Sequence, residues 1–448
     1  AYVNRSVSLL ALSRLDEALE ASNRAIEVDP ACLAGLNNRG VVLNEQGRYA
    51  EALESFDRAL ALKPDFVDAL NNRGLSLTHM DRHEEAERHY LDTLARFPGY
   101  ASAVNNLGLV YASMNRADEA QRRFGEAYAI KPDYVDAHWN ESLMALVQGD
   151  FPKGWPLYEW RWKKPEFAPH RRTFHVPQWT GREPLEGRTI FAHFEQGFGD
   201  AIQFVRYAEL LRGRGAKVLL SMPAGLRKLA EHSFPGMPVF CGQEVLPPFD
   251  CHIPFLSLPL AFGTTVETIP ARVPYLVPPP DRVEHWRERL GQAADRPRIG
   301  LVWSGNPKHA NDRRRSMPIE AVRRLLALPY RWFCLQRDVR EADAAALRDL
   351  PVEMLGASFD DFAETAAAIH ALDLVISVDT SVAHLGGALG RPTWVLLPFA
   401  PDWRWLLGRA DSPWYPGMRL FRQPRTGDYD AVVEHVRRAL EARFPETR

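Results

Sequence analysis

Two stretches of this chain place polar side chains where a ligand could bind. The first is Asp379-Thr380-Ser381, which follows the apolar run Leu374–Val378 and precedes a helical pattern. A helix start offers unpaired N–H groups and the positive end of a dipole, and here two hydroxyls add further donors, so the stretch suits a diphosphate. Thr380 or Ser381 could instead only cap the helix. The local pattern leaves both interpretations open.

The second stretch is Gly197-Phe198-Gly199-Asp200, which we expect as a loop between a strand at 189–194 and a helix at 201–212. It lacks the third glycine of a dinucleotide-binding fingerprint. Its interest is Asp200, a carboxylate at the mouth of the predicted sheet. By itself Asp200 is better explained as a helix cap, because the helix dipole there would weaken it as a base.

Strands and helices that could position these residues alternate from residue 187 onward. Parallel sheets bind ligands at the carboxyl ends of their strands, and both stretches follow predicted strands. Pro278-Pro279-Pro280 interrupts the pattern and indicates a hinge. The sequence therefore predicts two doubly wound, Rossmann-like lobes, 187–280 and 281–448, with a cleft between them. Residues 151–186 read as a connector and linker, in which Trp155, Tyr158, Trp160 and Trp162 are expected to pack against the next domain.

Residues 1–150 follow a different pattern, a repeat of 34 residues. Prolines, small residues and glycines all share this period, including Pro30, Pro64 and Pro98, and Gly40 and Gly74. Each unit holds two helical patterns joined by a short polar turn. The period and the pattern resemble the tetratricopeptide repeat. The resemblance implies a right-handed helical superhelix with a concave face that binds a partner.

Asparagines repeat at the same period, at Asn4, Asn38, Asn72, Asn106 and Asn140. In tetratricopeptide repeats this position lies on the first helix and faces the concave surface. The arrangement is similar to the asparagine ladder of O-linked N-acetylglucosamine transferases. That resemblance implies that Asn38, Asn72, Asn106 and Asn140 bind the backbone of a peptide acceptor, since a carboxamide both donates and accepts hydrogen bonds. The alternative is that asparagine is common at this position and that some of these side chains only bond within their own repeat.

Composition narrows the class of protein. The 448 residues allow two or three domains, and the net charge is −2. Residues 1–150 hold 15 Lys+Arg and 23 Asp+Glu, against 40 and 34 in the remainder, so neither part is basic enough to indicate nucleic-acid binding.

The four cysteines are scattered, which favours a reducing cytoplasm. No apolar run reaches about 18 residues, so no membrane span is expected. No signal peptide is visible, and the start at Ala1 inside a helical pattern indicates a fragment of a longer protein.

Residues 187–448 resemble the heptosyltransferases of glycosyltransferase family nine, which have the GT-B fold. Three motifs carry the resemblance: Gly199-Asp200-Ala201-Ile202, Asp379-Thr380-Ser381-Val382-Ala383-His384, and the weaker Arg315-Ser316-Met317-Pro318. The resemblance implies that Asp200 is the catalytic base, that Asp379, Thr380, Ser381 and His384 bind the nucleotide diphosphate, and that Arg315 contacts the donor. Ser381 stands where the family has Gly, and Arg315 where it has Lys.

The predicted fold class is therefore a tetratricopeptide superhelix followed by an α/β GT-B fold. Gln336, at the end of a predicted strand, is a further expected donor contact. No carboxylate-rich metal motif stands in a promising loop, so neither a metal nor a cofactor is expected. We predict a cytoplasmic, inverting glycosyltransferase that moves a sugar from an ADP-heptose-like donor to a protein or peptide held by the array. The alternatives are a transferase for lipopolysaccharide or polysaccharide acceptors, and an inactive scaffold.

Overall fold

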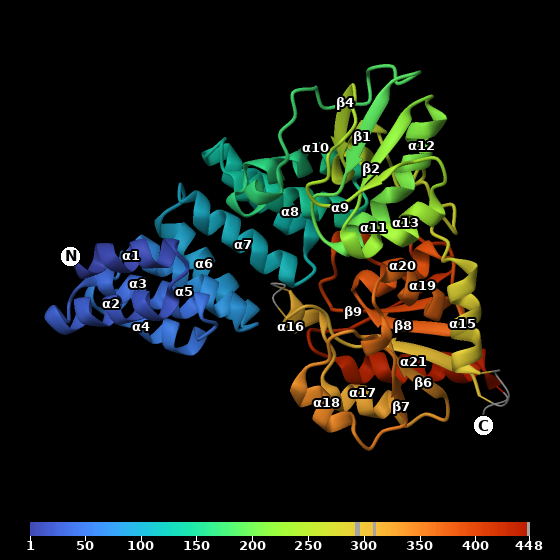
Figure 1. Ribbon diagram of the computed structural model, residues 1–448. Helices are drawn as coiled ribbons and strands as arrows, with labels where there is room; N and C mark the ends of the chain where they lie inside the picture. Colours follow the sequence, from blue (N-terminus) through green and yellow to red (C-terminus); the bar gives the residue numbers. More distant parts are fainter. Residues whose placement is uncertain (292–295, 308–310, 446–448) are drawn as a thin grey trace. The chain divides into compact units, whose positions relative to one another are not determined.

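The computed structural model describes residues 1–291, 296–307 and 311–445. These residues form two compact units, Ala1–Met144 and Ala145–Arg448. Figure 1 follows the chain from a series of helices into two groups of strands. The predicted fold class is confirmed at this level, because a helical array precedes an α/β region with two parallel sheets.

Helix pairs make up the first unit, and the first helices of successive pairs contact one another, as stacked repeats require. The helices are α1 Tyr2–Ala11, α2 Leu15–Val28, α3 Leu33–Glu45, α4 Tyr49–Leu62, α5 Val67–His79, α6 His83–Arg96, α7 Ala101–Ser113, α8 Ala117–Ile130 and α9 Val135–Gln148.

A glycine in the first helix of a pair lets an aromatic ring of the second helix approach its backbone. A Cβ atom on Gly40 would lie 2.5 Å from the Phe56 ring. A Cβ on Gly74 would meet the Tyr90 ring in the same way, and Gly108 repeats the arrangement at 2.5 Å. The 34-residue spacing of these glycines therefore reflects close packing, which leaves no room for a methyl group.

The connector continues the repeat pattern for one more helix, α10 Phe151–Tyr158, followed by the 3₁₀ helices η1 Glu159–Lys163 and η2 Pro165–His170. A Cβ on Gly154 would lie 2.5 Å from the Leu146 side chain of α9. The Trp155 and Tyr158 rings are buried and lie 5.4 and 5.9 Å from the Trp403 ring. These two aromatic residues of the connector therefore pack against the 3₁₀ helix η7 Trp403–Trp405 of the α/β region.

The first sheet of the second unit has four parallel strands in the order β3-β2-β1-β4. Its strands are β1 Thr189–His193, β2 Lys217–Ser221, β3 Val239–Phe240 and β4 Cys251–Pro254. The linker adds to the free edge of β4, where the Trp179 N–H donates to the His252 carbonyl at 2.8 Å. The helices of this lobe are α11 Phe198–Phe204, α12 Ala208–Gly213, α13 Arg227–Ser233 and α14 Leu258–Ala261.

The second sheet has six parallel strands in the order β10-β9-β8-β5-β6-β7. Its strands are β5 Arg298–Val302, β6 Arg331–Cys334, β7 Val352–Met354, β8 Leu374–Val378, β9 Thr393–Leu397 and β10 Met418–Arg422. The helices of this lobe are α15 Pro280–Leu290, α16 Asp312–Arg315, α17 Ile319–Leu326, α18 Glu341–Leu347, α19 Phe362–His370, α20 Ser381–Ala388 and α21 Tyr429–Arg443. β8 and β9 are buried throughout, as strands covered on both faces require.

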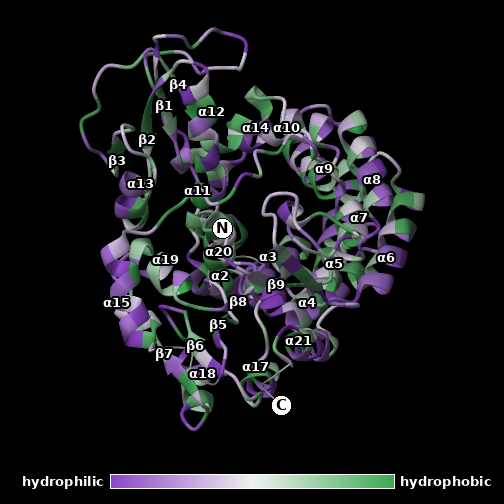
Figure 2. Cartoon of the chain, turned by 90° about the vertical axis from the view of Figure 1, so that its right-hand side faces the viewer, coloured by the Kyte–Doolittle hydropathy of each residue, from purple (hydrophilic) through white to green (hydrophobic). Residues whose placement is uncertain are grey.

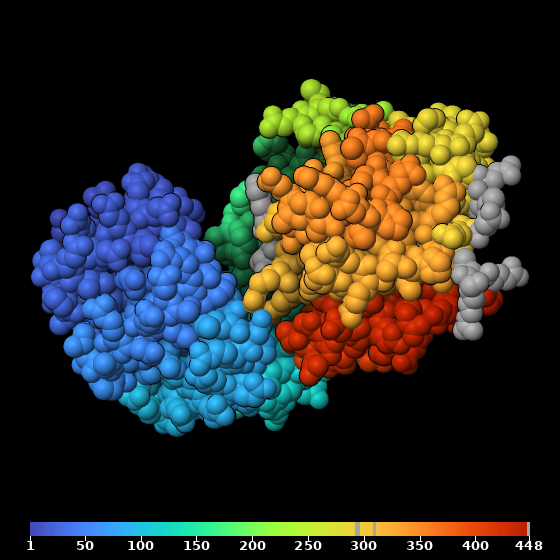
Figure 3. All heavy atoms as spheres, turned by 90° about the horizontal axis from the view of Figure 1, so that it is seen from below, coloured from blue at the N-terminus to red at the C-terminus, as the bar shows by residue number. Residues whose placement is uncertain are grey.

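The cores lie between each sheet and its helices. In Figure 2, β1 and β2 are mainly green, the colour of hydrophobic residues, whereas α15 is mostly purple, the colour of hydrophilic residues. Figure 3 shows α21, in red, on the surface of the six-stranded lobe, where it contacts α17 and β10. Within the described part of the chain, no helix is both long and apolar enough to cross a bilayer.

One local prediction is wrong, and another holds only in part. The helix expected at 201–212 begins at Phe198 and is interrupted by the 3₁₀ turn Val205–Tyr207, because Gly197 is extended and the Asp200 carboxylate accepts its N–H at 3.1 Å, which starts the helix earlier. Pro278 and Pro279 lie outside helices and strands, as the predicted break requires, and Pro280 is the first residue of α15. Proline lacks an N–H group, which costs nothing in the first turn of a helix.

Candidate functional site

The carboxyl ends of β5 and β8 are neighbours at the centre of the six-stranded sheet. β5 is the first strand of its lobe, with β6 and β7 on one side and β8, β9 and β10 on the other, so the strand order reverses between β5 and β8. Open α/β sheets bind ligands in the crevice at such a reversal. The segment after β8 carries Asp379, Thr380, Ser381 and His384. The predicted donor residues therefore lie at the edge where a ligand is expected.

Thr380 precedes α20 in extended conformation, with φ −144° and ψ 173°, and its side chain makes no capping hydrogen bond to that helix. Its hydroxyl lies 3.0 Å from the Ser377 hydroxyl instead. Thr380 and Ser381 are both half-buried. Because the Thr380 side chain does not cap this helix start, its first N–H groups and its dipole can act on an anion.

His384 is buried on α20, with its Nδ1 atom 2.8 Å from the Tyr415 hydroxyl. Its ring stacks on Trp405, with the centroids 5.1 Å apart. Burial, followed by the positive charges of Arg404 and Arg206, holds the pKa of His384 well below its usual value of 6.5. The imidazole is therefore neutral at pH 7. If the Tyr415 hydroxyl donates to Nδ1, the proton of the imidazole is on Nε2, where it can be donated to a phosphate oxygen.

Arg315 connects the segments that follow β5 and β8. Its Nη1 atom donates to the Asp379 carbonyl oxygen at 2.9 Å, and its Nε atom lies 3.3 Å from Asp312 Oδ1. A Cβ on Gly305 would collide with the Arg315 guanidinium, so that group lies directly against the chain after β5. These contacts place Arg315 at the strand-order reversal, together with the predicted donor residues. Burial, reinforced by the charge of Asp402, raises the pKa of the neighbouring Asp379 carboxyl.

Gln336 lies at the same edge, but its polar atoms are engaged within the lobe. Its Oε1 atom accepts from the Trp303 and Ser304 N–H groups at 2.6 and 3.0 Å, and its Nε2 atom donates to the Ser304 hydroxyl at 3.0 Å. Gln336 therefore holds the chain after β5 in place. Contact with a nucleotide, for which one N–H remains, stays a prediction.

Asp200 lies in the first turn of α11, and α11 packs against α20. A Cβ on Gly199 would lie 3.1 Å from the His384 ring and 3.8 Å from the Ser381 Cα atom. The two motifs singled out in the sequence are therefore in direct contact, although one belongs to each lobe. Both Asp200 oxygens have partners, because Oδ2 accepts from the Gly197 N–H and Oδ1 pairs with Arg404.

Arg404 is the main residue that the sequence analysis missed. It lies in the 3₁₀ helix η7 Trp403–Trp405, after β9, and its side chain is 11% exposed. Its Nη1 atom lies 2.8 Å from Asp402 Oδ1, while Nη2 pairs with Asp200. No family motif covers this segment. The sequence held one indication of its role: Arg404 stands between Trp403 and Trp405, and two tryptophans so close together are unusual on a solvated surface.

A second buried ion pair lies next to the Asp200 loop in the chain, at Glu195. The Arg161 Nε atom from η1 lies 2.9 Å from Glu195 Oε1, and both side chains are almost fully buried. Arg161 also donates to Glu159 and to the Ser257 hydroxyl. Burial raises the pKa of Glu195 to about 7, despite the opposing effect of Arg161. This pair ties the connector to the chain segment that precedes Asp200.

The asparagines of the array bond to one another in a continuous chain of carboxamides. Asn140 donates to Asn105, Asn105 to Asn106, Asn106 to Asn71, Asn71 to Asn72, and Asn72 to Asn37, at 3.0, 3.1, 2.9, 3.5 and 3.1 Å. Three of the predicted acceptor-binding residues, Asn72, Asn106 and Asn140, therefore each use one N–H between repeats. The fourth, Asn38, stands outside the chain, and its Nδ2 atom is buried without a hydrogen-bond partner among the described atoms.

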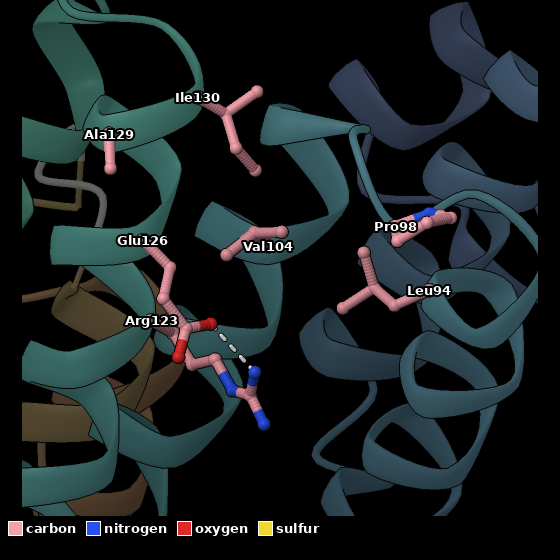
Figure 4. Close-up of a pocket in the computed structure, with 7 residues that line it drawn as sticks. All are labelled: Leu94, Pro98, Val104, Arg123, Glu126, Ala129 and Ile130. Atoms are coloured by element: carbon pink, nitrogen blue, oxygen red, sulfur yellow. Dashed lines mark hydrogen bonds and ion pairs between the residues drawn. The ribbon is translucent and has the colours of Figure 1, made fainter.

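The first unit also has a groove, on α6, α7 and α8 (Figure 4). It is lined mainly by apolar side chains and by the ion pair between Arg123 and Glu126, whose atoms are 2.7 Å apart. The lining residues are Leu94, Pro98, Val104, Arg123, Glu126, Ala129 and Ile130. None of them belongs to the carboxamide chain.

Comparison with known proteins gives a family match for the array and a curated relative whose match covers more than the array. Residues 4–65 and 65–133 match tetratricopeptide repeat models. Protein FlbA of Caulobacter vibrioides is 29% identical over 328 residues, which are 67% of this chain and 54% of FlbA, so the match spans about half the length of that relative.

Solved structures similar to the chain include the tetratricopeptide protein TTC0263 of Thermus thermophilus, with 22% identity, 37% of this chain and 90% of that chain covered, and a TM-score of 0.35. MamA of Desulfovibrio magneticus is 23% identical over 38% of this chain and 96% of its own, with a TM-score of 0.30. The family matches agree with the helix pairs and their 34-residue glycines. Residues 4–133 are tetratricopeptide repeats, and an α/β region with two parallel sheets follows them.

Proposed function

We propose that the α/β region is a glycosyltransferase that uses a nucleotide-diphosphate sugar, with the GT-B arrangement that its resemblance to family nine implies. One observation carries the proposal. The Gly199-Asp200 turn and the start of α20 come from different lobes and meet at the point where the strand order of the six-stranded sheet reverses. Sugar transfer needs a base for the acceptor hydroxyl beside a site that stabilises the departing diphosphate. These two groups of residues would meet both requirements.

The roles follow from the chemistry of each group. The start of α20, with Thr380 and Ser381, would bind the diphosphate, and neutral His384 would donate to one of its oxygens. Asp200 would accept the proton of the acceptor hydroxyl, which attacks the anomeric carbon directly and inverts it. Arg315 adds positive charge next to the same site. The family resemblance further implies that the donor is similar to ADP-heptose.

The array favours a protein or peptide as the acceptor, because tetratricopeptide repeats are protein-binding modules. The carboxamide chain changes how the array would bind it. Asn72, Asn106 and Asn140 already donate one N–H each between repeats, so each has one N–H left for a peptide backbone. A lipopolysaccharide or polysaccharide acceptor is the alternative and would not need these asparagines. A cytoplasmic location and the lack of nucleic-acid partners stay predictions.

A second candidate function is a scaffold without activity. The observation that favours it is the state of Asp200, which has both oxygens engaged and is paired with Arg404. A carboxylate whose oxygens both have partners has fewer lone pairs free for an acceptor hydroxyl. In this case the α/β region would support protein binding by the array and would not turn over a sugar donor.

Binding of sugar nucleotides separates these functions. A thermal-shift screen of the full chain with ADP-, GDP- and UDP-sugars should raise the melting temperature with at least one donor. Thr380→Val and His384→Ala should each weaken binding of that donor by about 1.5–3 kcal/mol in calorimetry, because each removes a contact to a charged phosphate. No binding by the wild-type protein would favour the scaffold. Wild-type affinity in both variants would show that the donor binds elsewhere.

The acceptor class needs a separate measurement. Sugar incorporation from the identified donor is followed in a cell lysate, with the protein and lipid fractions counted apart. Label in the protein fraction that is lost when Asn38, Asn72, Asn106 and Asn140 are all replaced by alanine supports a peptide acceptor. Label confined to the lipid fraction, and unchanged in the fourfold variant, would instead establish a lipid-linked acceptor.

A further inference from the structure

Arg404 joins the two lobes of the α/β region by a pair of carboxylates. Its Nη2 atom pairs with Asp200 of the first lobe, and its Nη1 atom lies 2.8 Å from Asp402 of the second. The Asp402 carboxylate also accepts the Arg404 backbone N–H at 3.0 Å. The side chains of Arg404 and Asp200 are only 11% and 17% exposed. The guanidinium is therefore anchored at one end by Asp402 and reaches the predicted base with the other.

Two tryptophans fix the segment that carries this arginine. Trp403 packs on the connector rings of Trp155 and Tyr158, with centroids 5.4 and 5.9 Å away. Trp405 stacks on His384 of α20, at 5.1 Å and 24° between the planes. Arg404 lies between these two anchors in the chain, and its guanidinium carbon is 4.3 Å from the centre of the Trp403 ring. Its backbone is thus held beside the start of α20, where an anionic ligand would lie.

Carboxylates and arginines both lie near the start of α20. Asp379 and Asp402 lie close enough for the Asp402 charge to oppose ionisation of Asp379, and Arg404 acts on Asp379 in the opposite sense. A diphosphate at this helix start would add further negative charge. Guanidinium groups bind phosphate as well as carboxylate, in the same paired geometry. A diphosphate would therefore compete with Asp200 for the Nη2 side of Arg404.

We propose that Arg404 is a catalytic cation that exchanges Asp200 for the diphosphate of the sugar donor. The inference rests on the proposed function. With the donor bound, Nη2 of Arg404 contacts the diphosphate, and Asp200 is released to the acceptor hydroxyl. The acceptor oxygen then forms its bond to the anomeric carbon as the bond from that carbon to the phosphate oxygen breaks. The hydroxyl proton goes to Asp200, and the electron pair of the broken bond goes to the leaving diphosphate, which Arg404 and the start of α20 stabilise.

The exchange also gives the pair between Asp200 and Arg404 a function. A base that is held by a cation until the donor arrives cannot activate water or an acceptor prematurely. It also gives Asp402 a positioning role, since the Nη1 contact keeps Arg404 in the site while Nη2 changes partner. The sequence motifs of the resemblance assign no function to Arg404 or Asp402.

Calorimetric titration of the full chain with ADP, GDP and UDP tests the exchange. Arg404→Gln should weaken binding of the preferred diphosphate about 10- to 100-fold, and Arg404→Lys, which keeps the charge but not the forked geometry, should fall between. Asp200→Asn should bind the diphosphate more tightly than the wild type, by at least about threefold, because Arg404 no longer has to leave a carboxylate. Arg438→Gln, on the surface of α21, is the matched control and should bind as the wild type does.

The tightening in Asp200→Asn supports the exchange if it is absent when Asp200→Asn is combined with Arg404→Gln, because loss of a negative charge near the site favours an anion even when Arg404 is only structural. Asparagine can still accept the Gly197 N–H, so this variant should fold even if Arg404→Gln does not. Two results would overturn this inference and leave the proposed function standing. One is wild-type affinity in Arg404→Gln, and the other is unchanged or weaker binding in Asp200→Asn. If the wild-type protein binds none of the three diphosphates, the proposed function fails, and the inference fails with it.

Discussion

Asn71, at the centre of the carboxamide chain, should contribute more stability than an asparagine outside the chain. Its Oδ1 atom accepts from Asn106 at 2.9 Å, and its Nδ2 atom donates to Asn72 at 3.5 Å. A neutral hydrogen bond contributes about 0.5–1.5 kcal/mol net to stability, and the 3.5 Å bond is at the limit of useful geometry. Asn71→Ala should therefore lower the free energy of unfolding of the array by about 1–2 kcal/mol.

Two matched variants separate this effect from the loss of any asparagine. Asn37→Ala, at the end of the chain, removes one bond and should cost about 0.5–1.5 kcal/mol. Asn38→Ala should cost almost nothing, because the buried Nδ2 atom of Asn38 has no partner to lose. Urea unfolding of the full chain, followed by circular dichroism, gives the three free energies. Hydrogen exchange of α5 and α7 assigns any change to the array.

The reasoning would be refuted if Asn71→Ala were no more destabilising than Asn38→Ala. That result would mean that water replaces the carboxamide bonds without loss, since these side chains are only partly buried. The same series also bears on acceptor binding. If the asparagines serve only to join the repeats, then protein labelling should fall in proportion to the lost stability, and Asn38→Ala should leave it unchanged.

Three other changes have expected outcomes. Gly40→Ala should lower stability by about 1–3 kcal/mol in a urea titration, because its methyl group would lie 2.5 Å from the Phe56 ring; an unchanged midpoint would mean that the ring moves freely. Arg161→Leu should cost about 3–5 kcal/mol in thermal unfolding by leaving Glu195 buried without its partner, and adding Glu195→Gln should restore part of the loss. His193 has a pKa lowered to about 3 by burial, whereas an unfolded histidine titrates near 6.5, so the unfolded state binds more protons between these values. The stability that neutral His193 contributes is complete above about pH 6.5, and it falls by about 1.4 kcal/mol for each pH unit below that. His193→Phe should therefore make the urea midpoint less sensitive to pH between 7 and 5. An unchanged sensitivity would contradict this role of His193.

Much of the fold could be predicted from local patterns. The 34-residue period marked the helix pairs because close packing of stacked helices requires a small residue at the same place in every repeat, as Gly40 and Gly74 show. The apolar run at Leu374–Val378 indicated a buried strand, since such strands are covered on both faces. The strand Val352–Met354 was missed because its side chains lie at the sheet edge and are mostly exposed.

The boundaries of short elements depended on hydrogen bonds that the pattern does not reveal. The start of α11 at Phe198 follows from the bond between the Gly197 N–H and the Asp200 carboxylate. The opening of α15 at Pro280 follows from the tolerance of the first helical turn for proline. In both cases a residue type that usually marks a loop stands inside the first turn of a helix.

By itself, the sequence determined which residues of the candidate site follow a strand and open a helix, because that information is local. Asp200, Thr380 and Ser381 were found in this way. Only the tertiary structure decided their partners. Arg404 meets Asp200 across 204 residues of chain, and Asn72 bonds to Asn37 rather than to the equivalent residue Asn38. Such contacts depend on how lobes and repeats pack, and packing is set by the summed burial of many side chains, which no short motif records.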